Sequence, residues 1–98
     1  MYKIFLDKTK IFQCNVNIEG ASLDKSKARL LIETENFSLA FNGKIKPNGT
    51  VRIPINKLKG ILNEEESGKI SLEIIAEDTL FVPWEADYQA SMSKKVEI

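Results

Sequence analysis

The dominant pattern along the chain is an alternation of apolar and polar residues with a period of two. In residues 12–19, FQCNVNIE, the two kinds of residue alternate without a break. Successive side chains of a strand point to opposite faces, so this pattern predicts an antiparallel strand with one buried face and one wet face. Similar runs predict further strands at residues 2–7, 27–34, 37–41, 51–55, 69–75 and 94–98.

Turn-forming residues separate these runs. NG at 42–43, PNG at 47–49 and SGK at 67–69 favour turns or breaks, and residues 19–27 form a longer polar stretch. The PNG motif lies between GKIK and VRIPI, which predicts a β-hairpin. Short strands at this spacing predict a single all-β domain over residues 1–98. We expect an antiparallel β-sandwich or flattened β-barrel of about seven to nine short strands.

One segment departs from the strand period. The sequence INKLKGILNEEES has apolar residues at the spacing of one helix face, namely Ile55, Leu58, Ile61 and Leu62. Asn56 is a suitable N-cap, whereas Gly60 costs about 1 kcal/mol relative to alanine inside a helix. We therefore expect one short helix near residues 56–63, lying over an open end of the sheets.

Residues 72–90, LEIIAEDTLFVPWEADYQA, contain the chain's single tryptophan directly after a proline. Proline has no N–H to donate, so Pro83 predicts a sheet edge, a bulge or a crossing between sheets. After it, Trp84, Ala86 and Tyr88 share one face. Trp84 then either caps the core at a bend or belongs to a protein interface, whose candidate residues are Phe81, Trp84 and Tyr88.

Composition narrows the function classes. The chain has 98 residues, 43% of them apolar, with 14 basic and 14 acidic side chains. No apolar run approaches the roughly 20 residues of a membrane helix, and the start lacks a signal-peptide core, so neither a membrane partner nor export is expected. Residues 1–63 carry a net charge of +6 and residues 64–98 a net charge of −6. These charges either cancel between interleaved strands or attract a second copy.

The residues available for chemistry argue against an enzyme. The chain has no histidine, and Cys14 lies on the apolar face of its predicted strand. The adjacent carboxylates Glu77 and Asp78 lie at an expected turn, and neighbouring residues of a strand point to opposite faces, so they form a poor acid–base pair unless the chain bends there. NEEES at 63–67 is typical of the solvated end of a helix or loop. No glycine-rich phosphate loop or metal-ligand spacing is present, so we expect no cofactor and no metal.

A basic strand face is the alternative basis for function. The basic side chains that could face one groove are Arg29, Lys44, Lys46 and Arg52. Such a face would suit a ligand-binding or nucleic-acid-binding β-barrel. These residues do not interleave with aromatic ones, and the net charge is zero, so a nucleic-acid partner is not expected.

Two blocks of the chain resemble a small protein family of marine contractile-tailed bacteriophages, the cyanophages and their relatives. Residues 12–30 match the family pattern F-x-C-x-V-x-x-E-G-A-S-L-x-x-x-K-A-R-L. Residues 72–84 match L-E-V-I-A-E-D-T-x-F-x-x-W, with Ile74 in place of valine. Family members are described as phage structural or hypothetical proteins, some of them prohead-associated, and have no catalytic or binding residues to carry over.

The resemblance implies a non-enzymatic structural or assembly protein that acts through protein–protein contacts. Its partners would be its own copies or other phage structural proteins. Its location would be the host cytoplasm during assembly, after which it either stays in the virion or does not. Small all-β domains have sheet edges to protect, and pairing edges between copies is a common solution. We therefore also expect self-association.

Overall fold

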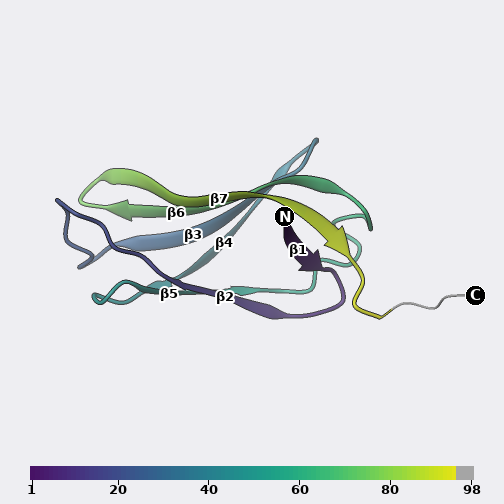
Figure 1. Ribbon diagram of the computed structural model, residues 1–98, viewed down its shortest axis with the longest axis horizontal. Helices are drawn as coiled ribbons and strands as arrows, with labels where there is room; N and C mark the ends of the chain where they lie inside the picture. The colour runs from purple at the N-terminus through teal and green to yellow at the C-terminus, as the bar shows by residue number, and fades with distance from the viewer. Residues whose placement is uncertain (95–98) are drawn as a thin grey trace, which may run out of the picture.

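The computed structural model describes residues 1–94 as strands joined by turns and loops (Figure 1). The strands are β1 (Tyr2–Phe5), β2 (Lys10–Asn15), β3 (Lys27–Glu33), β4 (Ser38–Ile45), β5 (Thr50–Ile55), β6 (Ser67–Ala76) and β7 (Thr79–Ser91). They form one 7-stranded sheet in the order β1-β7-β6-β3-β4-β5-β2. The prediction of an all-β fold is therefore confirmed.

The sheet curls into a half-barrel because β4 changes its neighbour along its length. Residues 38–43 pair with β3, whereas Lys44 and Ile45 pair with β5. We call β1, β7, β6, β3 and the start of β4 the large layer, and the end of β4, β5 and β2 the small layer. In Figure 1, β5 and β2 run below β3, β6 and β7. The described residues thus form one curled sheet, and not the two separate sheets of a sandwich.

Gly43 lies where β4 leaves β3 for β5. A Cβ atom at this position would lie 2.3 Å from Ile53 Cγ1 and 2.4 Å from the Arg52 carbonyl oxygen. The two strands therefore approach more closely than any side chain at residue 43 would allow. For this reason the Asn42-Gly43 pair is part of β4 and does not form the turn that we predicted.

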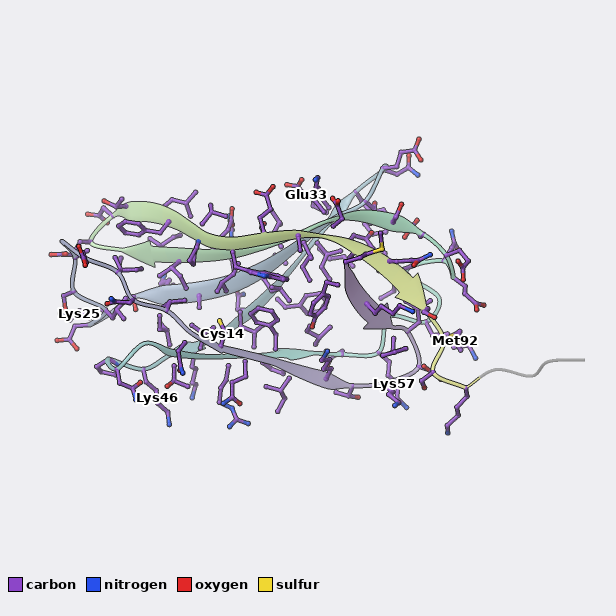
Figure 2. All side chains as sticks on the ribbon, in the orientation of Figure 1. Cys14, Lys25, Glu33, Lys46, Lys57 and Met92 are labelled. Atoms are coloured by element: carbon purple, nitrogen blue, oxygen red, sulfur yellow. The ribbon has the colours of Figure 1, made fainter. Side chains whose placement is uncertain are left out.

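The two layers bury their inward faces against each other. The fully buried aliphatic side chains at their centre are Leu30, Ile32, Val51, Ile53, Ile70, Leu72 and Ile74. Figure 2 shows side chains filling the space between the layers, with the Cys14 sulfur pointing into it. Each fully buried side chain of this size contributes about 1.5–3 kcal/mol, so the paired inward faces supply the main hydrophobic stabilisation.

The first strand lies parallel to the last. Tyr2 is opposite Tyr88, and Phe5 is opposite Ser91, in the β1–β7 pair. The other strand pairs of the described residues are antiparallel. The sheet is therefore mixed, which differs from the fully antiparallel arrangement that we expected. The reason is that β1 pairs with β7 and not with its neighbour in the chain, β2.

The predicted helix near residues 56–63 is wrong. The segment is a loop with one tight turn, in which the Leu62 N–H donates to the Leu58 carbonyl at 3.0 Å. The Leu58 N–H donates to the Leu6 carbonyl at 3.2 Å and ties the loop to the β1–β2 connection. Gly60 has a φ of 87°, a left-handed conformation that ends the turn. Leu58 and Leu62 are buried, so their helix-like spacing reflects two anchors of a loop.

Two tight turns form hairpins. The PNG turn at 47–49 joins β4 to β5 as predicted, and the Lys46 N–H donates to the Thr50 carbonyl at 2.9 Å. Glu77 and Asp78 join β6 to β7 with φ values of 49° and 61°. Two successive positive φ values are the signature of a type I′ turn, whose twist matches that of the flanking strands.

Other predicted boundaries need correction. The strand predicted at 12–19 ends at Asn15, although the Val16 N–H still donates to the Gly49 carbonyl at 2.8 Å. The predicted break at 67–69 lies inside β6. The strand predicted at 94–98 falls outside the described residues apart from its first residue.

Candidate functional site

Pro83 lies at a bulge in β7. Leu72 is opposite Trp84 and Ile74 is opposite Phe81, so β7 has one more residue than β6 between these pairs. A bulge accommodates a residue that has no N–H to give to the ladder. Of the three explanations that the sequence offered for this proline, the structure contains two, the bulge and the sheet edge, because β1 covers only residues 88–91 of β7.

Trp84 packs between the two layers against rings from two other strands. Its ring centroid lies 5.6 Å from that of Tyr2 in β1 and 5.2 Å from that of Phe12 in β2. The Tyr2 and Phe12 centroids are themselves 6.2 Å apart. Aromatic pairs of this kind contribute about 0.5–1.5 kcal/mol beyond the area that they bury. Trp84 is half-buried, and its buried part belongs to an aromatic cluster that joins the layers.

The three residues predicted to form an interface lie in different environments. Tyr88 is 0% exposed and faces the core, so its ring offers no contact surface. Phe81 and Trp84 are half-buried and pack against the core from its margin. The alternation that placed Trp84 and Tyr88 on one face was correct, but that face points inward.

A hollow of about 530 Å³ opens beside Trp84, between β2 and β7. It is lined by residues 12–17 together with Leu72, Pro83 and Trp84. None of these residues carries a charge, and the titratable group among them is the Cys14 thiol, whose pKa is raised by burial. β2 and β7 are not paired with each other, and the hollow marks the open side of the half-barrel.

The carboxylates next to Trp84 point to solvent, as the alternation predicts. Glu85 and Asp87 are both exposed. The Lys69 ammonium lies 2.6 Å from Asp87 Oδ1. Their hydrogen bond, helped by the charge attraction, lowers the pKa of Asp87 and raises the pKa of Lys69. Because both side chains are well exposed, such a pair contributes little to stability.

Three of the four residues of the predicted basic face do lie together. Lys44 and Arg52 are directly opposite each other in the β4–β5 pair, and Lys46 follows two positions after Lys44. With Thr50 and Pro54 they line a shallow groove of about 450 Å³. Figure 2 shows Lys46 projecting from the outer side of the small layer, away from the core.

Arg29 is separate from this groove. It belongs to β3 in the large layer, and its guanidinium Nε forms an ion pair with the Glu73 carboxylate. In contrast, residues 36–63, which include β4 and β5, contain five basic residues and no acidic residue. The opposite charges of the two halves of the chain therefore do not cancel over the small layer.

A second basic pocket was not predicted from the sequence. A cavity of about 250 Å³ beside β1 is lined by Lys3, Lys8 and Lys10 together with Tyr2 and Phe5. The Lys10 ammonium lies 4.8 Å from the centroid of the Tyr2 ring, and that of Lys8 lies 5.6 Å from the Phe5 ring. The sequence feature that could have predicted this pocket is the spacing of lysines and aromatic residues in YKIFLDKTK. That spacing indicates cation–π contacts only if the chain turns back between β1 and β2.

The Cys14 thiol is partly buried. Burial raises the pKa of the Cys14 thiol, which favours the unreactive protonated form. Residues 1–94 contain no group of three potential metal ligands. No helix long and apolar enough to cross a bilayer occurs in that part of the chain.

A scan against protein-family models matched no family, and a search of curated proteins found no similar protein.

Proposed function

We propose that this chain is a non-enzymatic structural or assembly protein of a tailed bacteriophage, which acts through protein–protein contacts and associates with itself. The observation that carries the proposal is the incomplete sheet. Within residues 1–94, β1 and β2 are the two ends of the strand order and do not pair with each other. An uncovered edge presents unpaired backbone N–H and C=O groups, which readily pair with another chain.

The titratable side chains of this protein favour a binding role over a catalytic one. General acid–base and nucleophilic catalysis need a positioned group whose pKa lies near the working pH. The sequence has no histidine, and the thiol of Cys14 has a pKa raised by burial. The hollow beside Trp84 is lined by uncharged residues. These features support a role in binding rather than in a reaction.

The resemblance of residues 12–30 and 72–84 to cyanophage structural proteins supports the phage part of the proposal. On this proposal the protein works in the host cytoplasm during assembly, contacts its own copies or other phage structural proteins, and stays in the virion. Peptide mass spectrometry of purified virions and of assembly intermediates, from a phage that encodes the chain, tests this role. We expect its peptides in both samples, and their absence from both would exclude an assembly role.

Light scattering tests self-association. The molar mass is measured from low to high micromolar protein at low and high salt. We expect the mass to rise with concentration from the 11.1 kDa of one chain to at least twice that value. A chain that stays monomeric at every concentration and both salt levels contradicts this part of the proposal.

The basic groove of the small layer favours a second candidate function, the binding of an anionic ligand such as a nucleic-acid backbone. Lys44 and Arg52 lie side by side with Lys46 next to them, and residues 36–63 contain no carboxylate side chain. None of the groove residues is aromatic, so contacts would be made to phosphates and not by stacking on bases. Three phosphate contacts predict a slope of about −2.7 for log K against log salt on duplex DNA.

Fluorescence anisotropy with a labelled duplex oligonucleotide tests this candidate. Lys44→Ala removes one groove charge, and Lys27→Ala is the matched control because it removes an exposed lysine of β3 outside the groove. We expect Lys44→Ala to reduce the salt slope by about 0.9 and Lys27→Ala to leave it unchanged. Equal effects of the two variants, or no binding at low salt, would exclude the groove as an anion site.

A further inference from the structure

One hydrogen bond shows which backbone groups of β2 face its open edge. The Val16 N–H donates to the Gly49 carbonyl, and this pair continues the β2–β5 register. In an antiparallel ladder, the groups that point to the same neighbour occur at every second residue. Phe12 and Cys14 therefore bond to β5. The residues whose N–H and C=O groups point to the open edge are Ile11, Gln13 and Asn15.

The other edges of the sheet are protected. β1 is a short strand of 4 residues. β7 extends beyond β1, and its uncovered part contains Pro83 and a bulge, both of which disfavour pairing with another strand. β2 has 6 residues in unbroken register with β5 and contains neither proline nor a bulge. Among the described edges, β2 is therefore the one suited to accept a further strand.

We propose that β2 pairs antiparallel with β2 of a second copy, about a two-fold axis at Gln13. This pairing rests on the self-association proposed above, and it identifies the edge of β2 as the surface through which two copies associate. The open-edge groups of Gln13 bond to those of Gln13 in the second copy, and those of Ile11 bond to those of Asn15. Pairing these residues with one another keeps the inward faces of both copies on the same side of the sheet. The two small layers then form one continuous sheet.

The charges around β2 favour a second copy as the added strand. Lys8 precedes β2, Lys10 begins it and Glu19 lies beyond its end, and no residue from 11 to 18 is charged. About an axis at Gln13, antiparallel pairing places Lys10 and Lys8 of one copy opposite Val16 and Ile18 of the other, beside Glu19. Asp7 lies opposite Glu19, outside the paired strands of both copies. A parallel arrangement would instead bring the lysines of the two copies together. Opposite charges on adjacent strands stabilise the pairing, and like charges oppose it.

Substitution of Gln13 by proline tests the pairing directly. Gln13→Pro removes an N–H that points to the open edge and leaves the hydrogen bonds between β2 and β5 in place, whereas Gln13→Ala keeps the N–H. Sedimentation equilibrium should show the wild type and Gln13→Ala dimerising with the same Kd. We expect Gln13→Pro to dimerise at least about tenfold more weakly, because two hydrogen bonds are lost across the axis.

A charge-swap pair tests the two-fold axis without changing the backbone. Gln13→Lys and Gln13→Glu each place like charges opposite each other, so we expect each to dimerise about fivefold more weakly and an equimolar mixture to recover the wild-type Kd or better. If the wild type forms a dimer and neither the proline variant nor the charged variants weaken it, the pairing does not use the edge of β2. Self-association itself would still hold. A strictly monomeric wild type overturns self-association itself.

Discussion

Trp84 of β7 and Phe12 of β2 lie with their ring centroids 5.2 Å apart and their planes inclined by 42°. The two strands belong to different layers and share no backbone hydrogen bonds in the described residues. On the opposite side of the half-barrel, β4 joins the layers through its own backbone. The aromatic contact therefore holds the layers together on the side where the sheet is open.

Loss of this contact should destabilise the fold. Truncation of a buried large aromatic costs about 3–5 kcal/mol, and half-buried Trp84 belongs at the lower end, so we expect about 3 kcal/mol for Trp84→Ala. In a domain of this size that corresponds to a fall of more than about 10 °C in Tm. Glu85→Ala and Asp87→Ala, at exposed neighbours, should each change stability by less than about 0.5 kcal/mol. An unchanged Tm combined with lost self-association would make Trp84 a contact residue.

Gly43 should tolerate no side chain. The Cβ of Gly43→Ala would meet Ile53 Cγ1 at 2.3 Å and the Arg52 carbonyl oxygen at 2.4 Å. One of these is a backbone atom held in a strand, so the strain cannot be relieved by side-chain movement, and we expect a loss of about 2–3 kcal/mol. Urea unfolding measures it, with Asn42→Ala as the exposed control in the same strand. Equal midpoints for the two variants would show that the layers can separate at this point without cost.

The β6–β7 turn offers a stabilising substitution. Asp78 has a φ of 61°, which glycine adopts without steric cost. Asp78→Gly should therefore raise the free energy of unfolding by about 0.5–1 kcal/mol. The control is Glu77→Gly, which relieves the same kind of strain but loses the hydrogen bond from the Ser22 N–H to the Glu77 carboxylate at 2.8 Å. If thermal unfolding shows Asp78→Gly to be less stable than the wild type, the Asp78 side chain contributes more to stability than its backbone conformation costs.

Asp7 should make stability depend on pH in the acid range. It accepts hydrogen bonds from the Ser93 N–H at 2.9 Å and the Ser93 hydroxyl at 2.8 Å, and from the Lys94 N–H at 3.1 Å. The bond from the Ser93 N–H contributes most to lowering the pKa of Asp7 from 3.8 to about 2. A carboxyl group with a lower pKa in the folded state stabilises the fold above its unfolded pKa and loses this effect as the pH falls toward the folded value.

The wild type should therefore lose more stability than Asp7→Asn between about pH 4 and pH 2, where the carboxylate becomes protonated. Urea midpoints at several pH values for both proteins measure the difference, in which the contributions of other carboxylates cancel. Parallel pH profiles for the two proteins would mean that the pKa of Asp7 is the same in the folded and the unfolded chain.

Strand positions were predictable because alternation reports burial directly. Phe12 and Cys14 point inward as the pattern predicts, since a strand places every second side chain on the same face. The partner of each strand was not predictable from the same pattern. YKIF carries no information that it pairs in parallel with the distant β7. The spacing of Leu58 and Leu62 indicated a helix because two buried anchors of a loop can have the same spacing as one helix face.

The residues of the basic groove and of the predicted interface could be grouped correctly from the sequence only where a nearby turn fixes how two strands pair. Lys44 and Arg52 face each other because the PNG turn sets the β4–β5 register, and that turn is evident in the sequence. Arg29 was grouped with them wrongly, because its ion pair with Glu73 depends on a β3–β6 register that no local signal specifies. Tyr88 was assigned to an interface because alternation indicates which residues share a face, but not whether that face is covered.

The parallel pairing of β1 with β7 also orders events during synthesis. β1 leaves the ribosome before its partner strand exists, and at about 5–20 residues per second the rest of this chain takes several seconds to follow. During that time Tyr2 and Ile4 lack the strand beside which they pack. When β7 emerges, however, β1 is already present, and residues 88–91 can be covered at once. β6 waits for the same partner, because β7 also covers its edge over Ser67–Ala76. Until β7 emerges, the chain therefore exposes an edge of β6 as well as β1, and β7 then completes both pairings in one step.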